Sequence, residues 1–236
     1  MPEITIFSLF LCLLPMVAVF WIFKTWSGSG REVIHATLRM TIQLVAIGFA
    51  LVFLFQEDNP LIGLMVIGVM IVASSFIAVR TVRENKRAAI TKAMIANAAG
   101  SGSVFLFVLF AVLQVRDPWY QPRVLIPIAG MVFSNAMTSI TLAVERFERE
   151  TGTGATYKEA RAAAWNAALI PQINALLAVG LVSLPGMMTG QILAGIDPLV
   201  AVRYQIVVMA MVLQSSSFSV AIFLTMSCPK PSGKGP

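Results

Sequence analysis

The chain alternates between long apolar stretches and short polar segments. Seven stretches contain no Asp, Glu, Lys or Arg, and they cover 4–23, 40–56, 59–79, 93–115, 124–144, 162–196 and 204–229. A helix that crosses the hydrocarbon core of a bilayer needs about 20 apolar residues. The stretches are apolar all round, whereas the strands of a membrane barrel alternate in polarity. The pattern therefore predicts an all-α polytopic membrane protein with about seven spans.

Two parts of this pattern are irregular. The stretch 162–196 is too long for one straight helix and too short for two spans with a turn. Proline removes a backbone hydrogen bond and clashes with the preceding turn, so we expect a surface helix over 162–170 that ends at Pro171. One span over 172–195, broken near Pro185, would follow, and a re-entrant segment stays open as the alternative. Near the N-terminus, 27–30 reads as a flexible turn and 31–39 as a surface helix that leads into the second span.

Composition and charge support a membrane location. Hydrophobic residues make up 58% of the chain and charged residues 12%, about half the charged share of a soluble domain. With the N-terminus outside, 14 of the 17 basic residues fall on inner segments. Basic residues concentrate on cytoplasmic loops, which predicts an outer N-terminus and an inner C-terminus rather than a nucleic-acid patch. We expect one transmembrane domain over 1–236 in a bacterial inner (plasma) membrane, with a flexible tail over 228–236.

The chemistry that is missing restricts the function. None of the 11 acidic residues lies inside a span, and the single histidine, His35, lies in an inner segment. Proton-coupled carriers usually need an intramembrane carboxylate or histidine, and hydrolytic sites need comparable groups. We therefore expect no catalysis by this chain. The sequence also lacks a phosphate-binding GxxxxGK[ST] loop, so any ATP and Mg²⁺ would be bound by another polypeptide.

The inner segment 145–171, here called the knob, carries a specific signal. It contains Gly152-Thr153-Gly154-Ala155-Thr156 between two helical patterns. Glycine adopts backbone angles that other residues avoid, and threonine is a good N-cap for a following helix. The pattern predicts a helix, a tight turn and a second helix on the cytoplasmic side. A solvated charged loop is the alternative interpretation.

The knob resembles the coupling loop of ABC-transporter permeases. Glu148 stands six residues before Gly154, and Pro171 is in the place of the proline that closes the second helix of that loop. Arg149 and Glu150 replace the two alanines of the usual pattern. By this resemblance, Glu148, Gly154, Ala155, Thr156 and Pro171 would contact or support a cytoplasmic ATPase subunit.

Further motifs resemble the FetB family of ABC-transporter permeases, which includes a bacterial iron-export permease and plant aluminium-tolerance proteins. The similarity extends over about 31–226, and the motifs are Leu38-Arg39, Gln43-Leu44, 126–131, Asn135-Ala136-Met137, 180–190, Gly195 with Asp197-Pro198, and Tyr204-Gln205. The resemblance implies a permease that works with a separate ATPase, with two copies of each. Asn174 and Leu177 stand where the family pattern has an acid and a lysine one turn apart.

The break at Pro185-Gly186 also has a physical meaning. A discontinuous transmembrane helix has free backbone groups, which are tolerated where they face protein or a water-filled cavity. Close helix packing is an equally good interpretation, because small residues let helices approach. We expect the translocation pathway to include eight residues: Asn135, Asn174, Pro185, Gly186, Met187, Met188, Thr189 and Gln205.

Two other polar groups occur in the spans. Ser134, Asn135, Thr138 and Ser139 recur at helical spacing and predict a face turned away from lipid, and 215–217 predicts interhelical hydrogen bonding.

No metal ligands are identified, and a pathway without acids or histidine suits a polar solute, a chelated metal or a soft metal ion better than bare Fe²⁺. A stand-alone channel or secondary carrier is the alternative to an ABC permease, and a structural membrane protein is the third possibility.

Overall fold

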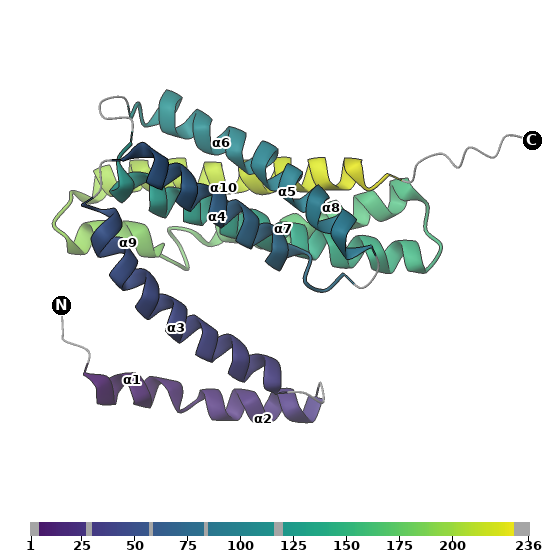
Figure 1. Cartoon of the computed structure of the whole chain (residues 1–236), viewed down its shortest axis with the longest axis horizontal. Helices are drawn as coiled ribbons and strands as arrows, with labels where there is room; N and C mark the ends of the chain where they lie inside the picture. Colours follow the sequence, from purple (N-terminus) through teal and green to yellow (C-terminus); the bar gives the residue numbers. More distant parts are fainter. Residues whose placement is uncertain (1–4, 27–29, 57–58, 83–84, 116–119, 229–236) are drawn as a thin grey trace, which may run out of the picture. The chain divides into compact units, whose positions relative to one another are not determined.

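The computed structural model describes residues 5–26, 30–56, 59–82, 85–115 and 120–228. Nearly all of these residues are helical (Figure 1). Five helical segments in the described part are long and apolar enough to cross a membrane. The all-α polytopic membrane architecture predicted from the sequence is therefore confirmed. The predicted turn at 27–29 and the predicted tail beyond Cys228 lie outside the described residues.

Contacts divide the chain into two compact units, Met1–Glu57 and Asp58–Pro236. The first unit contains α1 (Ile6–Leu13), α2 (Met16–Trp26) and α3 (Arg31–Leu54). The predicted single span over 4–23 is wrong in one respect, because the helix is interrupted at Leu14 and Pro15. Pro15 has no backbone N–H to continue the helical ladder.

The predicted helix over 31–39 leads directly into the second apolar stretch, since α3 continues through Arg39 to Leu54. The hydroxyls of Thr37 and Thr41 donate to the carbonyls one turn back, over 2.8 and 3.0 Å. These bonds satisfy the polar side chains within the helix itself. The helix α3 therefore runs without a break from its polar first turns into its apolar part.

The second unit begins with α4 (Pro60–Ala78). Asn59 caps it by accepting a hydrogen bond from the N–H of Leu61 at 3.0 Å, and Pro60 occupies the first turn, where no N–H is needed. A continuous helical segment over 86–112 follows, consisting of α5 (Lys86–Ala96), η1 (Asn97–Ser101), α6 (Gly102–Phe107) and η2 (Val108–Val112). The two η segments are π-helical turns, in which backbone hydrogen bonds join residues five positions apart instead of four.

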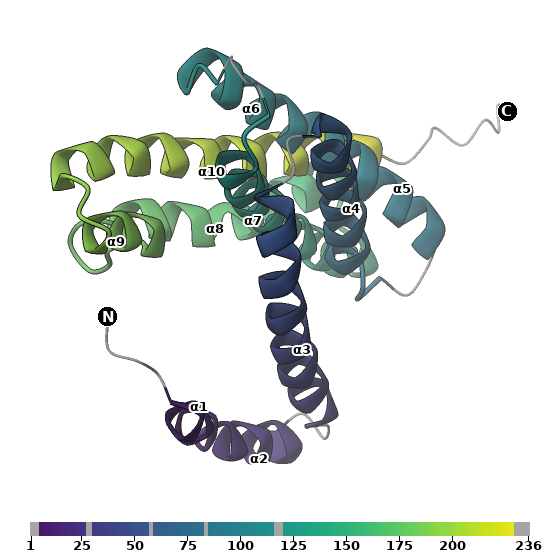
Figure 2. The same cartoon turned by 60° about the vertical axis from the view of Figure 1, so that its left-hand side comes forward.

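The rest of the second unit consists of α7 (Pro122–Gly152), α8 (Tyr157–Ala178), α9 (Gly186–Leu193) and α10 (Pro198–Met226). The helix α10 runs along α7 and α8 (Figures 1 and 2). Asp197 caps α10 through the N–H groups of Leu199 and Val200, at 2.8 and 3.3 Å. These helices surround the candidate sites described below.

The predicted arrangement of 162–196 needs correction. Pro171 lies inside α8, which continues to Ala178 instead of ending at Ile170. The interruption falls at 179–185, where Gly180 has φ +82° and Pro185 precedes the first turn of α9. One lost hydrogen bond at Pro171 is a local cost, and α8 offsets it by packing along both α7 and α10.

Two apolar clusters stabilise the second unit. One contains Phe105, Leu109, Phe133 and Met211, all between 1% and 3% exposed. The other is rich in alanine, and its Ala78, Ala93, Ala96, Ala143, Ala164 and Ala168 are fully buried. Small side chains let helix backbones approach closely, which is the usual basis of helix packing in membranes. The unit is thus assembled by side-chain packing rather than by charge pairs.

Buried polar contacts join three of these helical segments. Asn97 in η1 donates to the hydroxyl of Ser74 in α4, and the hydroxyls of Ser101 and Ser219 lie 2.8 Å apart between η1 and α10. The expectation of interhelical bonding at 215–217 is wrong for Ser215, which donates to Val212 in its own helix. Ser219, one turn further on, makes the interhelical contact instead.

Membrane orientation gives a direct prediction. The distribution of basic residues predicts an inner C-terminus. A phosphatase fused after Pro236, active only outside the cytoplasm, should therefore be inactive, and a green fluorescent protein at the same site should fluoresce. A fusion after Gln121 should give the opposite pattern. An active phosphatase after Pro236 would contradict the predicted orientation.

Candidate coupling and translocation sites

The turn between α7 and α8 is closed by a glycine. Gly154 has φ +89°, a left-handed conformation that L side chains rarely adopt. Its N–H donates to the carbonyl of Thr151 at 3.1 Å, and the N–H of Ala155 reaches back to Glu150 at 3.1 Å. These two bonds form a Schellman motif, which satisfies the last free carbonyls of a helix. The predicted glycine turn is confirmed, and its geometry requires glycine at position 154.

The second helix of the knob begins with a reciprocal cap. The N–H of Glu159 donates to the hydroxyl oxygen of Thr156 at 3.4 Å, while the Glu159 carboxylate accepts from the N–H of Thr156 at 2.9 Å. The Thr156 hydroxyl also donates to that carboxylate at 2.7 Å. This capping box fixes the first residue of α8. The N-cap role predicted for Thr156 is confirmed, whereas the role of Glu159 was missed, although Thr-x-x-Glu is its sequence signature.

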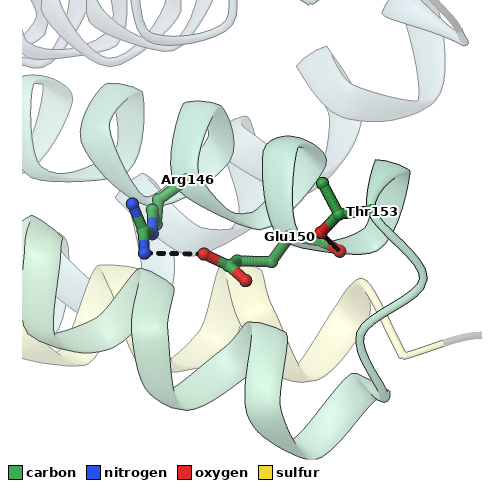
Figure 3. Close-up of polar contacts among 3 residues, drawn as sticks. All are labelled: Arg146, Glu150 and Thr153. Carbon is green, nitrogen blue, oxygen red and sulfur yellow. Dashed lines mark hydrogen bonds and ion pairs between the residues drawn. The ribbon is translucent and has the colours of Figure 1, made fainter.

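The last turns of α7 carry two ion pairs. Arg146 and Glu150 lie 2.6 Å apart, and Arg149 and Glu145 lie 3.0 Å apart. Figure 3 shows the first pair, with the Thr153 hydroxyl donating to the backbone carbonyl of Glu150 at 2.8 Å. Exposed pairs at this spacing contribute only a few tenths of a kcal/mol each, about 0.3–0.5. Their main effect is to keep the end of α7 helical up to the turn.

Tyr157 joins the knob to the end of α10. Its hydroxyl donates to the carbonyl of Leu224 at 2.9 Å, and its ring packs edge-on against Phe147 with the centroids 6.1 Å apart. The Arg161 guanidinium lies 5.5 Å from the centre of the same ring. Sequence reasoning missed Tyr157, and no local pattern indicates a contact with a residue 67 positions away. The knob is formed by α7 and α8, and Tyr157 attaches it to a third helix, α10.

Glu148 lies away from the turn. It lines a pocket of about 220 Å³ between α5, α7 and the end of α10, together with Asn85, Lys92, Thr151 and Ser227. The other predicted coupling residues Gly154, Ala155 and Thr156 are consecutive in the turn. Pro171 lies 15 residues beyond Thr156, about 22 Å along α8 at 1.5 Å per residue. The structure therefore brings Gly154, Ala155 and Thr156 together and separates Pro171 from them.

The capping box predicts a pH dependence. Hydrogen bonds from the Thr156 hydroxyl and then from the Thr156 N–H lower the pKa of Glu159 below its ordinary value. A carboxyl whose pKa is lowered by folding stabilises the fold above its unfolded pKa, and this contribution is lost as pH falls through the folded value. The melting temperature of wild type relative to Glu159→Gln should therefore rise between pH 3 and pH 6. Glu145→Gln is the matched control, and an equal pH response in both variants would contradict the prediction.

Met188 and Gln205, two of the predicted pathway residues, line one groove. The groove has a volume of about 510 Å³ and lies between the end of α8, the segment 179–185, α9 and α10. Its lining is apolar apart from Gln205, which is 6% exposed. The groove thus unites residues from two segments that are close together in the fold but separate in sequence.

Met187, the neighbour of Met188, lies in a different pocket. That pocket has a volume of about 270 Å³ and is lined by Gln191, Tyr204 and Met211, together with residues of α7 that include Pro127. Consecutive helical residues point in directions about 100° apart, so α9 contributes to both cavities. The prediction of one pathway that contains both methionines is not supported by their placement.

The remaining predicted pathway residues are dispersed. The Gln172 side chain donates to Asn135 at 3.3 Å, between α7 and α8, while Asn174 is exposed on α8. The predicted break near Pro185 is present as the interruption at 179–185, and Pro185 and Gly186 lead into α9. The Pro185 carbonyl accepts from both the N–H and the hydroxyl of Thr189, at 3.0 and 3.1 Å. The carbonyl of Pro185 is therefore bonded within α9.

One face of α7 is polar and exposed. Ser134 and Thr138 are exposed, Gly130 and Thr141 are half-buried beside them, and a Cβ on Gly130 would meet nothing within 4 Å. The exposed residues of α4 are instead large and apolar, such as Met65 and Val69. Ser139, also predicted to lie on a face turned away from lipid, is buried and lies 3.5 Å from the Gln172 amide nitrogen. The predicted polar face thus divides into an exposed part and a part that packs against α8.

Long apolar helices, a polar exposed stripe and a structured knob define a polytopic helical membrane protein. The profile of the Uncharacterised protein family (UPF0014) matches residues 5–230, and the chain belongs to this family. The resemblance to FetB-type permeases is confirmed, and the chain is an integral membrane protein of a permease family.

Three relatives illustrate the family. The chain is 35% identical to a UPF0014 membrane protein, slr1647, of Synechocystis, over 82% of this chain and 81% of the relative. It is 33% identical to the probable iron export permease protein FetB of Escherichia coli, over 94% and 91% of the two chains. It is 32% identical to the protein ALUMINUM SENSITIVE 3 of Arabidopsis thaliana, over 80% and 72%. No solved structure matches the chain.

Proposed function

We propose that this chain is the permease subunit of an ABC transporter. It moves a metal ion, a metal complex or a small polar solute across a bacterial plasma membrane, and a separate cytoplasmic subunit binds and hydrolyses Mg-ATP. Two copies of the permease and two of the ATPase form the transporter. The relative named as a probable iron export permease supports this reading of the family.

The observation that carries the proposal is the structured knob. A solvated loop needs no defined shape, but this turn has a Schellman motif, a capping box and a hydrogen bond from Tyr157 to Leu224. A rigid projection attached to α7, α8 and α10 can transmit the closure of an ATPase as movement of whole helices. A stand-alone channel or carrier has no need of such a device.

The solute in this proposal is polar or complexed. The apolar stretches offer no acid or histidine, and the described residues include no group of three or more His, Cys, Asp or Glu side chains that could hold a metal. The exposed hydroxyls and amides of α7 and α8 suit hydrogen bonding to a solute. Bare Fe²⁺ sites usually draw on histidine and carboxylate, so free iron fits these residues less well than a chelate.

ATP hydrolysis by the purified complex tests the proposal. The permease would be expressed with the ATPase encoded nearest to it, purified by a tag on the permease alone, and reconstituted in liposomes. We expect the ATPase to co-purify and its hydrolysis to rise several-fold with chelated iron or with a nucleotide sugar, and less with free Fe²⁺. Solute flux without any bound ATPase would support the channel or carrier alternative. Strong stimulation by free Fe²⁺ alone, lost in Met187→Leu and Met188→Leu, would overturn the substrate assignment.

A further inference from the structure

The pocket that contains Met187 and Gln191 lies at the opposite end of α7 from the knob. It is bounded by the first turns of α7, by η2, by α9 and by α10, and its volume is about 270 Å³. Small-molecule pockets usually measure about 300–1,000 Å³, so this one suits a small ion or molecule. Its lining shares no residue with the knob or with the groove beside Met188.

The floor of this pocket is apolar and buried. Val108, Ile128, Val208 and Met211 line it and are each between 1% and 6% exposed. Met187 adds a second thioether to the lining. Thioether sulfur makes favourable contacts with aromatic rings, and the flexible methionine side chain adapts to an apolar body. The floor therefore suits an apolar group of about the size of one ring.

The rim of the pocket is polar and carries a positive charge. Arg123, in the first turn of α7, and Tyr204, on α10, are both exposed, and Arg123 is the one charged residue among the described residues of the lining. A guanidinium has five N–H donors in a planar fork that matches the two oxygens of a carboxylate. A contact with one neighbour therefore leaves donors for a ligand. The Tyr204 hydroxyl can donate a further hydrogen bond, so the rim favours an anion.

Gln191 adds a third donor to the lining. It is half-buried, and its Oε1 atom is enclosed by protein without a hydrogen bond from any described residue. A primary amide has an acceptor end and a donor end. Because the acceptor end is enclosed, only the donor end, Nε2, is available to a ligand in the pocket. Such a donor suits an anionic oxygen and disfavours an ammonium group.

Anchoring at the membrane surface does not account for these three residues together. Arginine and tyrosine are common at the ends of membrane helices, where they reach the head-group region. Arg203 on α10 fits that description, because it is exposed and does not line the pocket. Arg123, Gln191 and Tyr204 instead come from α7, α9 and α10 and line one cavity over an apolar floor. Donors that converge in this way, without an acid beside them, are what an oxyanion site requires.

We propose that this pocket binds the carboxylate of a small organic anion, with the apolar body of the anion on the buried floor. Arg123 pairs with the carboxylate, Gln191 and Tyr204 donate to its oxygens, and the two methionines contact the apolar body. The inference rests on the proposed function in one respect, namely that the bound anion, free or as a metal chelate, is the transported solute. It narrows that solute from polar species in general to carboxylates.

Three probes with one ring and different head groups test the site. Benzoate, benzamide and benzylamine are anionic, neutral and cationic, and each would be titrated by calorimetry into the purified full-length permease in detergent. We expect benzoate to bind at least about tenfold more tightly than the other two, because hydrogen bonds to charged groups are the stronger ones. Arg123→Gln should remove this preference, and Tyr204→Phe should weaken benzoate binding several-fold. Absence of saturable benzoate binding, or equal binding of benzoate and benzamide, would overturn the proposal.

Arg203→Gln is the matched control for Arg123→Gln. Arg203 directly precedes Tyr204 on α10 and is also an exposed arginine, but it lies outside the pocket. This variant should keep the wild-type preference for benzoate, and both variants should keep the wild-type helical circular dichroism. Loss of the preference in both variants would mean that positive surface charge in general attracts benzoate, and the proposed site would be wrong.

A lipid head group is another source of an oxyanion with an apolar body. Native mass spectrometry of the delipidated permease distinguishes the two sources. We expect benzoate to bind whether or not phosphatidylglycerol is added. Phosphatidylglycerol that is retained by wild type, lost in Arg123→Gln and able to block benzoate would assign the pocket to lipid and overturn the proposal.

The role of the bound anion is tested in the complex with the ATPase. Benzoate should stimulate ATP hydrolysis by wild type and by Arg203→Gln, but not by Arg123→Gln. Unchanged hydrolysis while benzoate is bound would overturn its assignment to the transported solute. Selective benzoate binding by a permease that no ATPase accompanies would count against the proposed function alone. An ATPase that co-purifies with a permease that does not bind benzoate would count against this inference alone.

Discussion

Valine at position 154 should abolish solute-stimulated ATP hydrolysis while the permease remains inserted in the membrane. Gly154 has φ +89°, and a left-handed conformation costs an L residue about 1–2 kcal/mol, with β-branched side chains the least tolerant. The turn would relax to another geometry and lose the bonds from Gly154 and Ala155 to the end of α7. An ATPase fitted to the original shape of the knob would then lose its contact.

Gly152→Val is the matched control for this change. Gly152 lies two residues earlier at the end of α7, its φ is not positive, and an added Cβ would meet nothing within 4 Å. We expect this variant to keep at least half of the stimulated ATPase rate. Hydrolysis by reconstituted complexes, normalised to the amount of inserted permease, is the measurement. Unchanged stimulation in Gly154→Val would favour a solvated loop over a coupling knob.

Alanine at position 100 should destabilise the second unit strongly. A Cβ on Gly100 would lie 2.6 Å from the backbone nitrogen of Ser219 and 2.7 Å from its Cα. Alanine gains up to about 1 kcal/mol over glycine in a helix, but overpacking in a close contact costs about 1–3 kcal/mol or more. A backbone atom cannot rotate away, so the clash prevails and η1 must separate from α10. We expect the melting temperature in detergent to fall by about 5 °C or more.

Gly102→Ala separates the clash from the effect of helix propensity. Gly102 lies two residues further along the same helical segment, and an added Cβ there meets nothing within 4 Å. This variant should melt at the wild-type temperature or slightly above it. Equal melting temperatures for the two variants would mean that η1 and α10 are not in close contact.

The sequence predicted the long helices well because their signal is a simple one. Uninterrupted apolar stretches match α4, the segment 86–112, α7 and α10, and caps at Asn59, Thr156 and Asp197 fix where three helices begin. Proline was harder to interpret. Pro15 interrupts the first apolar stretch whereas Pro171 does not interrupt α8. The difference depends on packing, because α8 has α7 and α10 beside it, which a local sequence rule cannot include.

The candidate sites were predictable to the extent that they are local. Glycine favours the left-handed conformation seen at Gly154, and threonine favours the N-cap position seen at Thr156, so the residue types alone indicated both roles. The contact between Tyr157 and Leu224, and the grouping of Met188 with Gln205, join residues from separate helices. Such pairs depend on how the helices pack. Met187 and Met188 line different cavities because α9 is turned so that one points to each side. The orientation of a helix about its axis cannot be read from two neighbouring residues.

The two π-helical turns at η1 and η2 also bear on how this segment tolerates changes in length. A π turn amounts to one extra residue accommodated within an otherwise regular helix. It displaces the angular phase of every later residue, and the buried residues of η1 are Asn97, Gly100 and Ser101. Loss of one residue from either turn would return it to α-helical winding and preserve the orientation of the flanking helices. A single-residue deletion elsewhere in 86–112 would rotate the buried side chains beyond it out of register, so these two turns are where the segment can change length and keep its packing.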